Sequence, residues 1–185
     1  MKTPPLPSSL SFKRIATLLS LAVAIAAPFA AHAEKQTLKA NVDGAVFESD
    51  DDGILLVPLV GSFSLSATTK GFGVYPPPAG LSDRLAISCR GFDAKPRKYT
   101  IQDFRDGRCD ASFTKGQSKQ PFGKPVAEFE SPRDATQQKS FIDVTSASGK
   151  VIEGKFLVEL VPEGSPKGTK AIIAEGTFKG ENRQK

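Results

Sequence analysis

The stretch Ile152-Glu153-Gly154-Lys155-Phe156-Leu157-Val158-Glu159-Leu160 places a small or apolar residue at every second position. Successive side chains of a strand point to opposite faces of a sheet, so this pattern predicts a β-strand with one buried face. A helix would instead need apolar residues three and four apart over ten or more residues, and no segment after residue 33 keeps that period. The stretch therefore favours a domain built from antiparallel strands.

Shorter stretches with the same alternation recur along the chain. Turn residues, above all Asp-Gly pairs, separate them at the short intervals typical of all-β proteins. The stretches are residues 38–42, 63–67, 85–89, 99–104, 127–130 and 141–145, and the pairs are Asp43-Gly44, Asp52-Gly53 and Asp106-Gly107. We predict a single all-β domain, residues 34–185, folded as an antiparallel β-sandwich or open β-barrel of about 8–10 strands.

A short motif, E-G-x-F, occurs twice near the end of the chain, as Glu153-Gly154-Lys155-Phe156 and Glu175-Gly176-Thr177-Phe178. The two copies are predicted to be the strands of a hairpin, each bent at its glycine where a neighbouring segment comes close. Together with the opening Lys39-Ala40-Asn41-Val42-Asp43-Gly44-Ala45-Val46-Phe47, this ending resembles secreted bacterial β-domains of uncharacterised role. In those domains a G-x-F strand, a turn and a second G-x-F strand complete the fold. The resemblance implies a fold and no activity.

Residues 1–33 have the three parts of a secretory signal peptide. The pair Lys13-Arg14 precedes an apolar run at 15–27, and Ala31-His32-Ala33 is a cleavage site of the A-x-A kind. A membrane anchor is the alternative, but a span needs about 20 apolar residues and Pro28 interrupts this run. We therefore expect cleavage after Ala33, a periplasmic or secreted product, and no stable membrane insertion.

The composition excludes several classes of function. The 185 residues include 25 Lys and Arg against 20 Asp and Glu, a formal charge of +5. Three of these cations and the only histidine, His32, lie in the predicted signal peptide. The product is thus close to neutral, which removes the main reason to expect nucleic-acid binding. Without histidine, Ser-His-Asp or Cys-His catalysis and His-ligated metal are excluded, so we expect no enzyme, no cofactor and no metal.

Cys89 and Cys109 are the only cysteines. An exported protein meets oxidising conditions, so we predict that they pair. The bond would close a loop of roughly 20 residues and contribute ~3 kcal/mol of stability in the chain-entropy treatment. Two separate buried thiols are the alternative, and a redox role is not indicated because C-x-x-C is absent.

Two acidic stretches are candidates for chemistry. Residues 48–52 offer carboxylates for calcium, but the three aspartates are consecutive and the Glu that closes an EF-hand loop is missing. A solvated hairpin turn ending at Gly53 is the simpler interpretation. Asp103, Asp106 and Asp110 are the first candidates for a hydrolase that uses carboxylates alone. The pair Asp106-Gly107 equally indicates a turn whose acids pair with neighbouring arginines.

The candidate binding residues lie in two stretches that cannot be central strands. Phe72, Tyr75, Pro76 and Pro77 belong to an aromatic and proline-rich stretch, and Phe122 stands between proline and glycine in a polar one. Stiff proline segments bind partners at low entropic cost, and exposed aromatic side chains anchor interfaces. Alternatively, both phenylalanines fold back and plug the ends of the barrel.

Three hypotheses about function follow from these patterns. The first is an exported, non-catalytic β-domain that binds another protein of unknown identity, as an envelope interaction module or an inhibitor. The second is a carrier of a small apolar ligand or lipid, which requires an interior larger than the side chains fill. The third is the carboxylate hydrolase, and we rank the three in this order.

Overall fold

The computed structural model describes residues 35–72, 80–117, 125–132 and 139–183. The predicted signal peptide, residues 1–33, lies outside these ranges, as do Tyr75, Pro76, Pro77 and Phe122. Within the described residues the chain forms eleven strands and one short helix, which confirms the all-β prediction. Their bounds are β1 Thr37–Val42, β2 Ala45–Ser49, β3 Ile54–Leu59, β4 Gly61–Thr68, β5 Ser82–Phe92, β6 Arg97–Tyr99, α1 Ile101–Arg105, β7 Cys109–Gln117, β8 Ala127–Glu130, β9 Phe141–Ser148, β10 Val151–Pro162 and β11 Ile172–Glu181.

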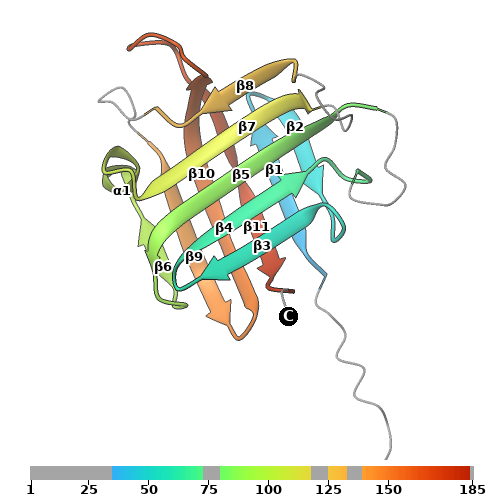
Figure 1. Cartoon of the computed structure of the whole chain (residues 1–185), viewed down its shortest axis with the longest axis vertical. Helices are drawn as coiled ribbons and strands as arrows, with labels where there is room; N and C mark the ends of the chain where they lie inside the picture. The colour runs from blue at the N-terminus through green and yellow to red at the C-terminus, as the bar shows by residue number, and fades with distance from the viewer. Residues whose placement is uncertain (1–34, 73–79, 118–124, 133–138, 184–185) are drawn as a thin grey trace, which may run out of the picture. The chain divides into compact units, whose positions relative to one another are not determined.

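The strands form one long antiparallel sheet that folds over on itself into two layers (Figure 1). The β1 layer has the order β6-β9-β10-β11-β1-β2, and the β5 layer has the order β8-β7-β5-β4-β3. Strand β10 joins the layers, because its first part pairs with β9 whereas Val161 and Pro162 pair with β8. The strands of the two layers cross obliquely, as in a barrel that is nearly closed.

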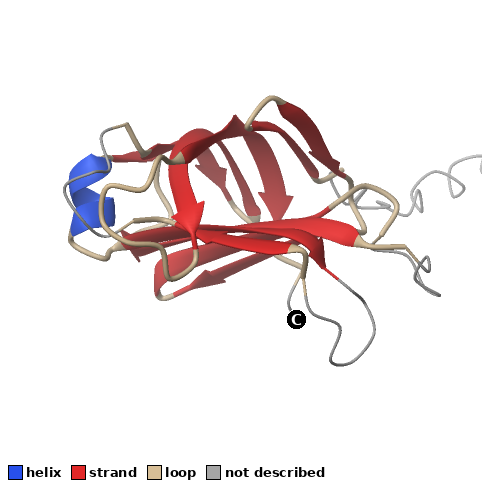
Figure 2. Cartoon of the chain, turned by 90° about the horizontal axis from the view of Figure 1, so that it is seen from above, coloured by secondary structure: helices blue, strands red, loops and turns tan. Residues whose placement is uncertain are grey.

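The core lies between the two layers, which Figure 2 shows edge on. The alternation along β10 explains its construction, since Ile152, Phe156, Val158 and Leu160 are buried while Lys155 is exposed. Buried side chains from both layers and from α1 form a single cluster. Each fully buried Leu, Ile or Phe stabilises the fold by about 1.5–3 kcal/mol before the entropy of the chain is counted.

The E-G-x-F motifs pair with each other, as predicted. In the register of β10 and β11, Gly154 lies opposite Phe178, and Gly176 lies opposite Phe156. A Cβ on Gly154 would come within 2.7 Å of the Phe178 ring and within 2.5 Å of a carbonyl oxygen of β9. A Cβ on Gly176 would overlap the backbone of β1. Each glycine thus leaves space for the ring or strand beside it, so the repeated glycines are a packing requirement.

The expected strand at residues 99–104 is wrong after its first residue. Strand β6 ends at Tyr99, and α1 begins at Ile101. The Asp103 carboxylate accepts the Thr100 N–H at 2.8 Å, half of a capping box that favours a helical turn over an extended strand. Because α1 has only five residues, it is too short to show a helical apolar period in the sequence.

The turn at residues 50–53 exists, but it is not the hairpin turn that we expected. Strand β2 pairs only with β1, and β3 pairs only with β4, so the turn carries the chain between the edges of the two layers. A backbone hydrogen bond joins the layers beside it, from the Lys70 N–H to the Glu48 carbonyl at 2.7 Å, and the bond from the Thr68 N–H to the Gly53 carbonyl at 2.9 Å extends the β3–β4 pairing into the turn. The crossover therefore brings the two free edges of the sheet together.

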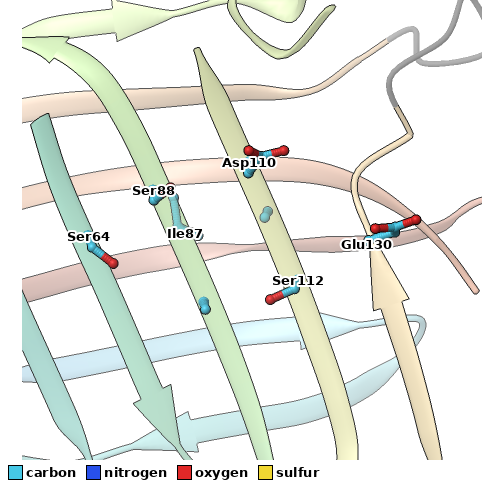
Figure 3. Close-up of a pocket in the computed structure, with 8 residues that line it drawn as sticks. Ser64, Ile87, Ser88, Asp110, Ser112 and Glu130 are labelled. Atoms are coloured by element: carbon cyan, nitrogen blue, oxygen red, sulfur yellow. The ribbon is translucent and has the colours of Figure 1, made fainter. Parts of the chain in front are cut away.

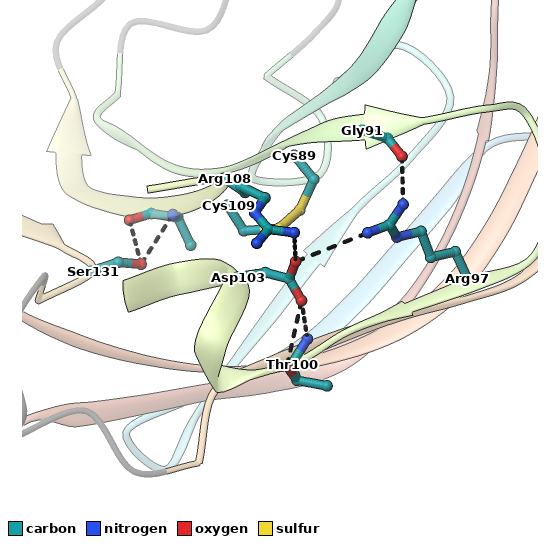
Figure 4. Close-up of a disulfide and its surroundings, with 9 residues drawn as sticks. Cys89, Gly91, Arg97, Thr100, Asp103, Arg108, Cys109 and Ser131 are labelled. Atoms are coloured by element: carbon teal, nitrogen blue, oxygen red, sulfur yellow. Dashed lines mark hydrogen bonds and ion pairs between the residues drawn. A yellow bond between two sulfur atoms is a disulfide. The ribbon is translucent and has the colours of Figure 1, made fainter. Parts of the chain in front are cut away.

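One end of the sandwich, which we call the closed end, is covered by the segment between β5 and β7. This segment leaves the β5 layer, pairs with β9 as β6, and returns through α1. A disulfide between Cys89 and Cys109 joins its two ends, as predicted (Figure 4). The two cysteines are directly opposite in the β5–β7 register, and their Cα atoms are 4.2 Å apart. The bond thus clamps the segment where it leaves and re-enters the sheet.

Aromatic side chains fill the closed end. The Phe63 ring of β4 packs against Phe92 with 5.2 Å between centroids and against Tyr99 with 6.1 Å. The Arg97 guanidinium lies over the Tyr99 ring, 4.8 Å from its centroid. Tyr99 belongs to β6, so the segment that covers the closed end also supplies one of the three aromatic rings there.

Candidate functional site

The opposite end of the sandwich, which we call the open end, is organised by Asp83. Asp83 lies in β5 where the register with β7 shifts. Its N–H donates to Thr69 Oγ1 at 2.9 Å, and its carboxylate accepts the Gly116 N–H at 2.8 Å. Thr69 precedes residues 73–79 and Gly116 precedes residues 118–124. Asp83 therefore fixes the points at which both stretches that we expected to bind a partner leave the sheet.

Three large apolar side chains are exposed at the open end. Leu81 is 54%, Val126 70% and Val46 79% exposed. Leu81 and Val126 lie side by side, since both have a methyl carbon within 3.4 Å of the position that a Cβ on Gly116 would take. Val46, on the β1 layer, lines a cavity together with Lys115, whose carbonyl accepts the Val126 N–H at 2.9 Å. A group of exposed apolar residues at one place marks a candidate contact surface, which single scattered residues do not.

The cavity, of about 150 Å³, opens between the two layers at this end. Its walls include three phenylalanine rings, and the Phe113 centroid is 6.2 Å from that of Phe47 and 6.3 Å from that of Phe129. The other residues that line it are Val42, Asp43, Ala45, Val46, Asp83, Lys115 and Ile172. An apolar chamber with a few charged groups is the usual form of a ligand site at the mouth of a barrel.

Of the five residues that we expected to bind a partner, the structure describes only Phe72. Phe72 is half-buried, its N–H donates to the Thr69 carbonyl at 3.1 Å, and its ring lies against Gly80. It therefore lies at the base of residues 73–79, beside the Asp83 contacts. Predictions for Tyr75, Pro76, Pro77 and Phe122 remain predictions.

The sequence patterns did not point to the other residues of the open end. Val46, Leu81 and Val126 are single apolar residues beside turns, and such residues are common on protein surfaces. A usable signal was present in Phe113 and Phe129, which face each other on β7 and β8. To use it, the strands β7 and β8 would have had to be paired correctly from the sequence.

A second, shallower hollow lies on the outer face of the β5 layer (Figure 3). Short hydroxyl side chains from neighbouring strands line it, and Ser64, Ser88 and Asp110 stand in one row across β4, β5 and β7. Ser112 and Glu130 form the next row. Its lining contains no aromatic ring and no cation, and its apolar members are Ala86, Ile87 and Ala111, so it offers mainly hydroxyls and carboxylates to a ligand.

The acids that we considered for a hydrolase have other surroundings. The Asp103 carboxylate lies 3.4 Å from Arg108 Nη1 and 4.0 Å from Arg97 Nη2 at the closed end (Figure 4). Asp106 pairs with Arg108 at 2.9 Å. Asp110 lies in the hollow on the outer face, whose lining includes neither Asp103 nor Asp106. The first two carboxylates thus hold α1 and its arginines together, and the third does not join them in one cleft.

The acidic stretch at residues 48–52 has a structural contact in Asp51. Its carboxylate receives hydrogen bonds from Arg183 at 2.6 and 3.0 Å and from the Gln36 N–H at 2.8 Å. The hydrogen bond from Arg183, followed by that from Gln36, holds the pKa of Asp51 below its usual value. Among the residues that the structure describes, no group of three or more His, Cys, Asp and Glu side chains is placed to hold a metal ion.

Comparison with protein families, with curated proteins and with solved structures gave no match to this chain. The resemblance to secreted bacterial β-domains therefore stays a prediction. In the described ranges, no helix combines the length and the apolar character that crossing a membrane requires, since α1 has five residues.

Proposed function

We propose that the protein is an exported, non-catalytic domain that binds another protein through the open end. The proposal rests on one observation, the exposed apolar residues of the open end, where Leu81 and Val126 lie side by side and Val46 lines the cavity. Interfaces have an apolar centre and a polar rim, and a few aromatic or aliphatic anchors carry most of the binding energy. The open end has such a centre, with Asp43, Asp83 and Lys115 around it.

The scaffold under these residues supports a binding role. Asp83 ties Thr69 to Gly116, and the Val126 N–H donates to the Lys115 carbonyl at 2.9 Å. Loops that carry binding residues are effective when a rigid sheet positions their ends, because less conformational freedom is then lost on binding.

Export is the second part of the proposal. The Cys89–Cys109 disulfide fits an oxidising compartment, because cytosolic thiols are kept reduced. The signal-peptide pattern of residues 1–33 supports the same compartment.

The size of the interior favours a protein partner over a lipid. Sites that enclose a drug-sized or larger ligand have roughly 300–1,000 Å³. Here side chains from both layers fill the space between the sheets, and the cavity at the open end measures about 150 Å³. A lipid chain is longer than this cavity, whereas a protein partner needs only the surface around it.

Affinity capture from the envelope fraction of the protein's own host tests the binding surface. The purified mature protein carries a C-terminal tag, and captured proteins are identified by mass spectrometry. We expect one specific partner, and at least a tenfold loss of it with the Leu81→Ser/Val126→Ser variant. The matched control is Leu55→Ser/Leu59→Ser, which removes two leucines of similar exposure, 56% and 61%, from β3.

The control should capture the partner as well as the natural sequence does. Full capture by the Leu81→Ser/Val126→Ser variant would exclude the open end as the binding surface. Loss with the β3 control instead would move the site to that strand. The intact mass of the recovered protein tests export, because we expect a chain that begins at Glu34 and lacks two hydrogens for the disulfide.

A further inference from the structure

We infer that the cavity at the open end is a binding site for a small, uncharged molecule with one aromatic ring. This inference goes beyond protein binding, because it needs no partner protein. It rests on the walls of the cavity, its volume and the position of its charged groups, which together select one class of ligand.

The walls favour an aromatic guest. The rings of Phe47 and Phe113 stand nearly perpendicular, at 84°, and the Phe129 ring also packs against Phe113, with 6.3 Å between centroids. Aromatic rings prefer edge-to-face or offset contacts, so a guest ring inside this group can present an edge to one wall and a face to another. Val42 and Ile172 add aliphatic contacts from the β1 layer.

The volume limits the guest to one ring. Apolar cavities of about 150 Å³ in protein interiors are known to take up benzene or xenon. The cavity here has about the same volume. Two fused rings with a substituent would need more space, and the filled core beneath the cavity offers none.

The charged groups select against a charged guest. The cavity is bordered by both signs of charge, Asp43 and Asp83 against Lys115. Asp83 already accepts the Gly116 N–H at 2.8 Å and bonds to Thr69. A carboxylate or ammonium group carried in among the phenylalanine rings would lose its water, and at the border its attraction to one charge would be opposed by the charge of the other sign. The neutral, apolar part of a ligand therefore decides whether it binds.

NMR titration with toluene tests the inference, with the methyl signals of Val42 and Ile172 as reporters. We expect saturable shifts of these signals with a dissociation constant on the order of 1 mM, as is typical for so few ligand atoms. Benzoate, which adds a charge to the same ring, should bind at least tenfold more weakly. Equal binding of benzoate, or no saturable shift at these methyls with toluene, would overturn the inference.

Two variants tie the binding to the cavity. Ala45 lines it and lies on the same face of β2 as buried Phe47, so Ala45→Leu should fill the space and weaken toluene binding at least tenfold. Ala86→Leu places the same larger side chain in the hollow on the outer face and should leave toluene binding unchanged. Equal toluene affinities of Ala45→Leu and the natural protein would contradict the assignment.

A second change keeps the test decisive if Ala45→Leu does not fold. Phe129 is only partly buried, and Phe129→Leu should enlarge the cavity without removing a wall. The enlarged cavity should then bind naphthalene, which the natural protein rejects. If both proteins bind naphthalene equally, the ligand lies elsewhere.

Discussion

Both ends of the sandwich contain a group of three aromatic rings, but they differ in how these rings are covered. Each has three interacting aromatic rings, Phe63, Phe92 and Tyr99 at the closed end and Phe47, Phe113 and Phe129 at the open end. At the closed end β6 and α1 lie across the rings, and a disulfide clamps this segment. At the open end the rings border a cavity of about 150 Å³ whose lining includes exposed Val46, and Leu81 and Val126 are exposed beside Gly116.

Under the proposed function, this difference assigns stability to one end of the fold and binding to the other. A sandwich must protect the apolar ends of its core, because exposed rings lose their stabilising contribution. The closed end achieves this with a chain segment, a covalent bond and the Asp103 contacts. The open end keeps apolar surface accessible beside a cavity, and in the proposed function a partner covers this surface.

Truncating one ring at each end should give the largest contrast. Tyr99 is completely buried, so Tyr99→Ala should lower the free energy of unfolding by about 3–5 kcal/mol. Phe129 is partly buried beside an existing cavity, and Phe129→Ala should cost about 1–2 kcal/mol. Urea denaturation of both variants measures the difference. Equal losses would mean that the open end is covered as thoroughly as the closed end.

The disulfide should matter mainly at the closed end. Replacing Cys89 and Cys109 together by alanine removes a cross-link that closes a loop of 20 residues. We expect a loss of about 3 kcal/mol in the free energy of unfolding. Hydrogen exchange should show faster opening of β6 and α1 than of β1 and β2 at the other end. A uniform increase in exchange across both ends would show that the bond stabilises the fold as a whole.

Each end is also held by one carboxylate, and the two can be compared directly. Asp103 is buried and contacts the Thr100 N–H, Arg97 and Arg108, so Asp103→Ala should cost about 2 kcal/mol. Asp83 is half-buried and accepts one backbone N–H through its side chain, so Asp83→Ala should cost about 1 kcal/mol.

Asp83→Ala has a second expected effect, which distinguishes the two carboxylates. Because the Asp83 carboxylate holds Gly116, next to Val126 and just before residues 118–124, capture of the partner should fall at least threefold with this variant. Asp103→Ala should leave capture unchanged once the protein is folded. The reverse order of effects on capture would place the binding surface at the closed end.

Alkaline pH should weaken the closed end through Tyr99. Burial raises the pKa of Tyr99 above its ordinary value of 10.0, and Arg97 opposes this only in part. The unfolded chain therefore loses this proton at a lower pH than the folded protein. The stability that neutral Tyr99 provides is complete below pH 10 and is lost as the pH rises through the folded pKa.

Thermal unfolding at pH 8 and pH 10.5 measures this dependence, with Tyr99→Phe as the control. The Tyr99 hydroxyl is buried and has no hydrogen-bond partner among the described residues, so the variant should be as stable as the natural protein at pH 8. It should lose less stability at high pH. Identical pH dependence of the two proteins would assign the alkaline loss to other groups.

The sequence predicted the parts of this comparison that depend on local pattern. Alternation identified β10 and the fold class, because side-chain direction in a strand has a period of two, and the second E-G-x-F copy identified β11 and its pairing with β10. The cysteine count and compartment predicted the disulfide. Strand β3, with the run Ile54-Leu55-Leu56-Val57, was missed because consecutive aliphatic residues show no alternation.

The two ends themselves could not be read from the sequence, because each combines distant segments. The closed end depends on β6 pairing with β9, more than 40 residues away, and on the one-turn helix after it. The open end unites the β1–β2 turn with β5, β7 and β8. Which residues lie next to Phe113 and Phe129 depends on the order of the strands in the sheet, and the sequence pattern does not give that order. The cavity and the exposed apolar residues of the open end therefore could not be predicted.

The smallest expected effect on stability concerns the exposed residues of the open end. Leu81→Ser and Val126→Ser remove side chains that are more than half exposed, so each should change the free energy of unfolding by no more than about 0.5 kcal/mol. Chemical denaturation measures this beside the capture experiment. A loss above about 1 kcal/mol would mean that these side chains are packed under other parts of the chain in solution. The open end would then be covered in the same way as the closed end, and its apolar residues would stabilise the core instead of binding a partner.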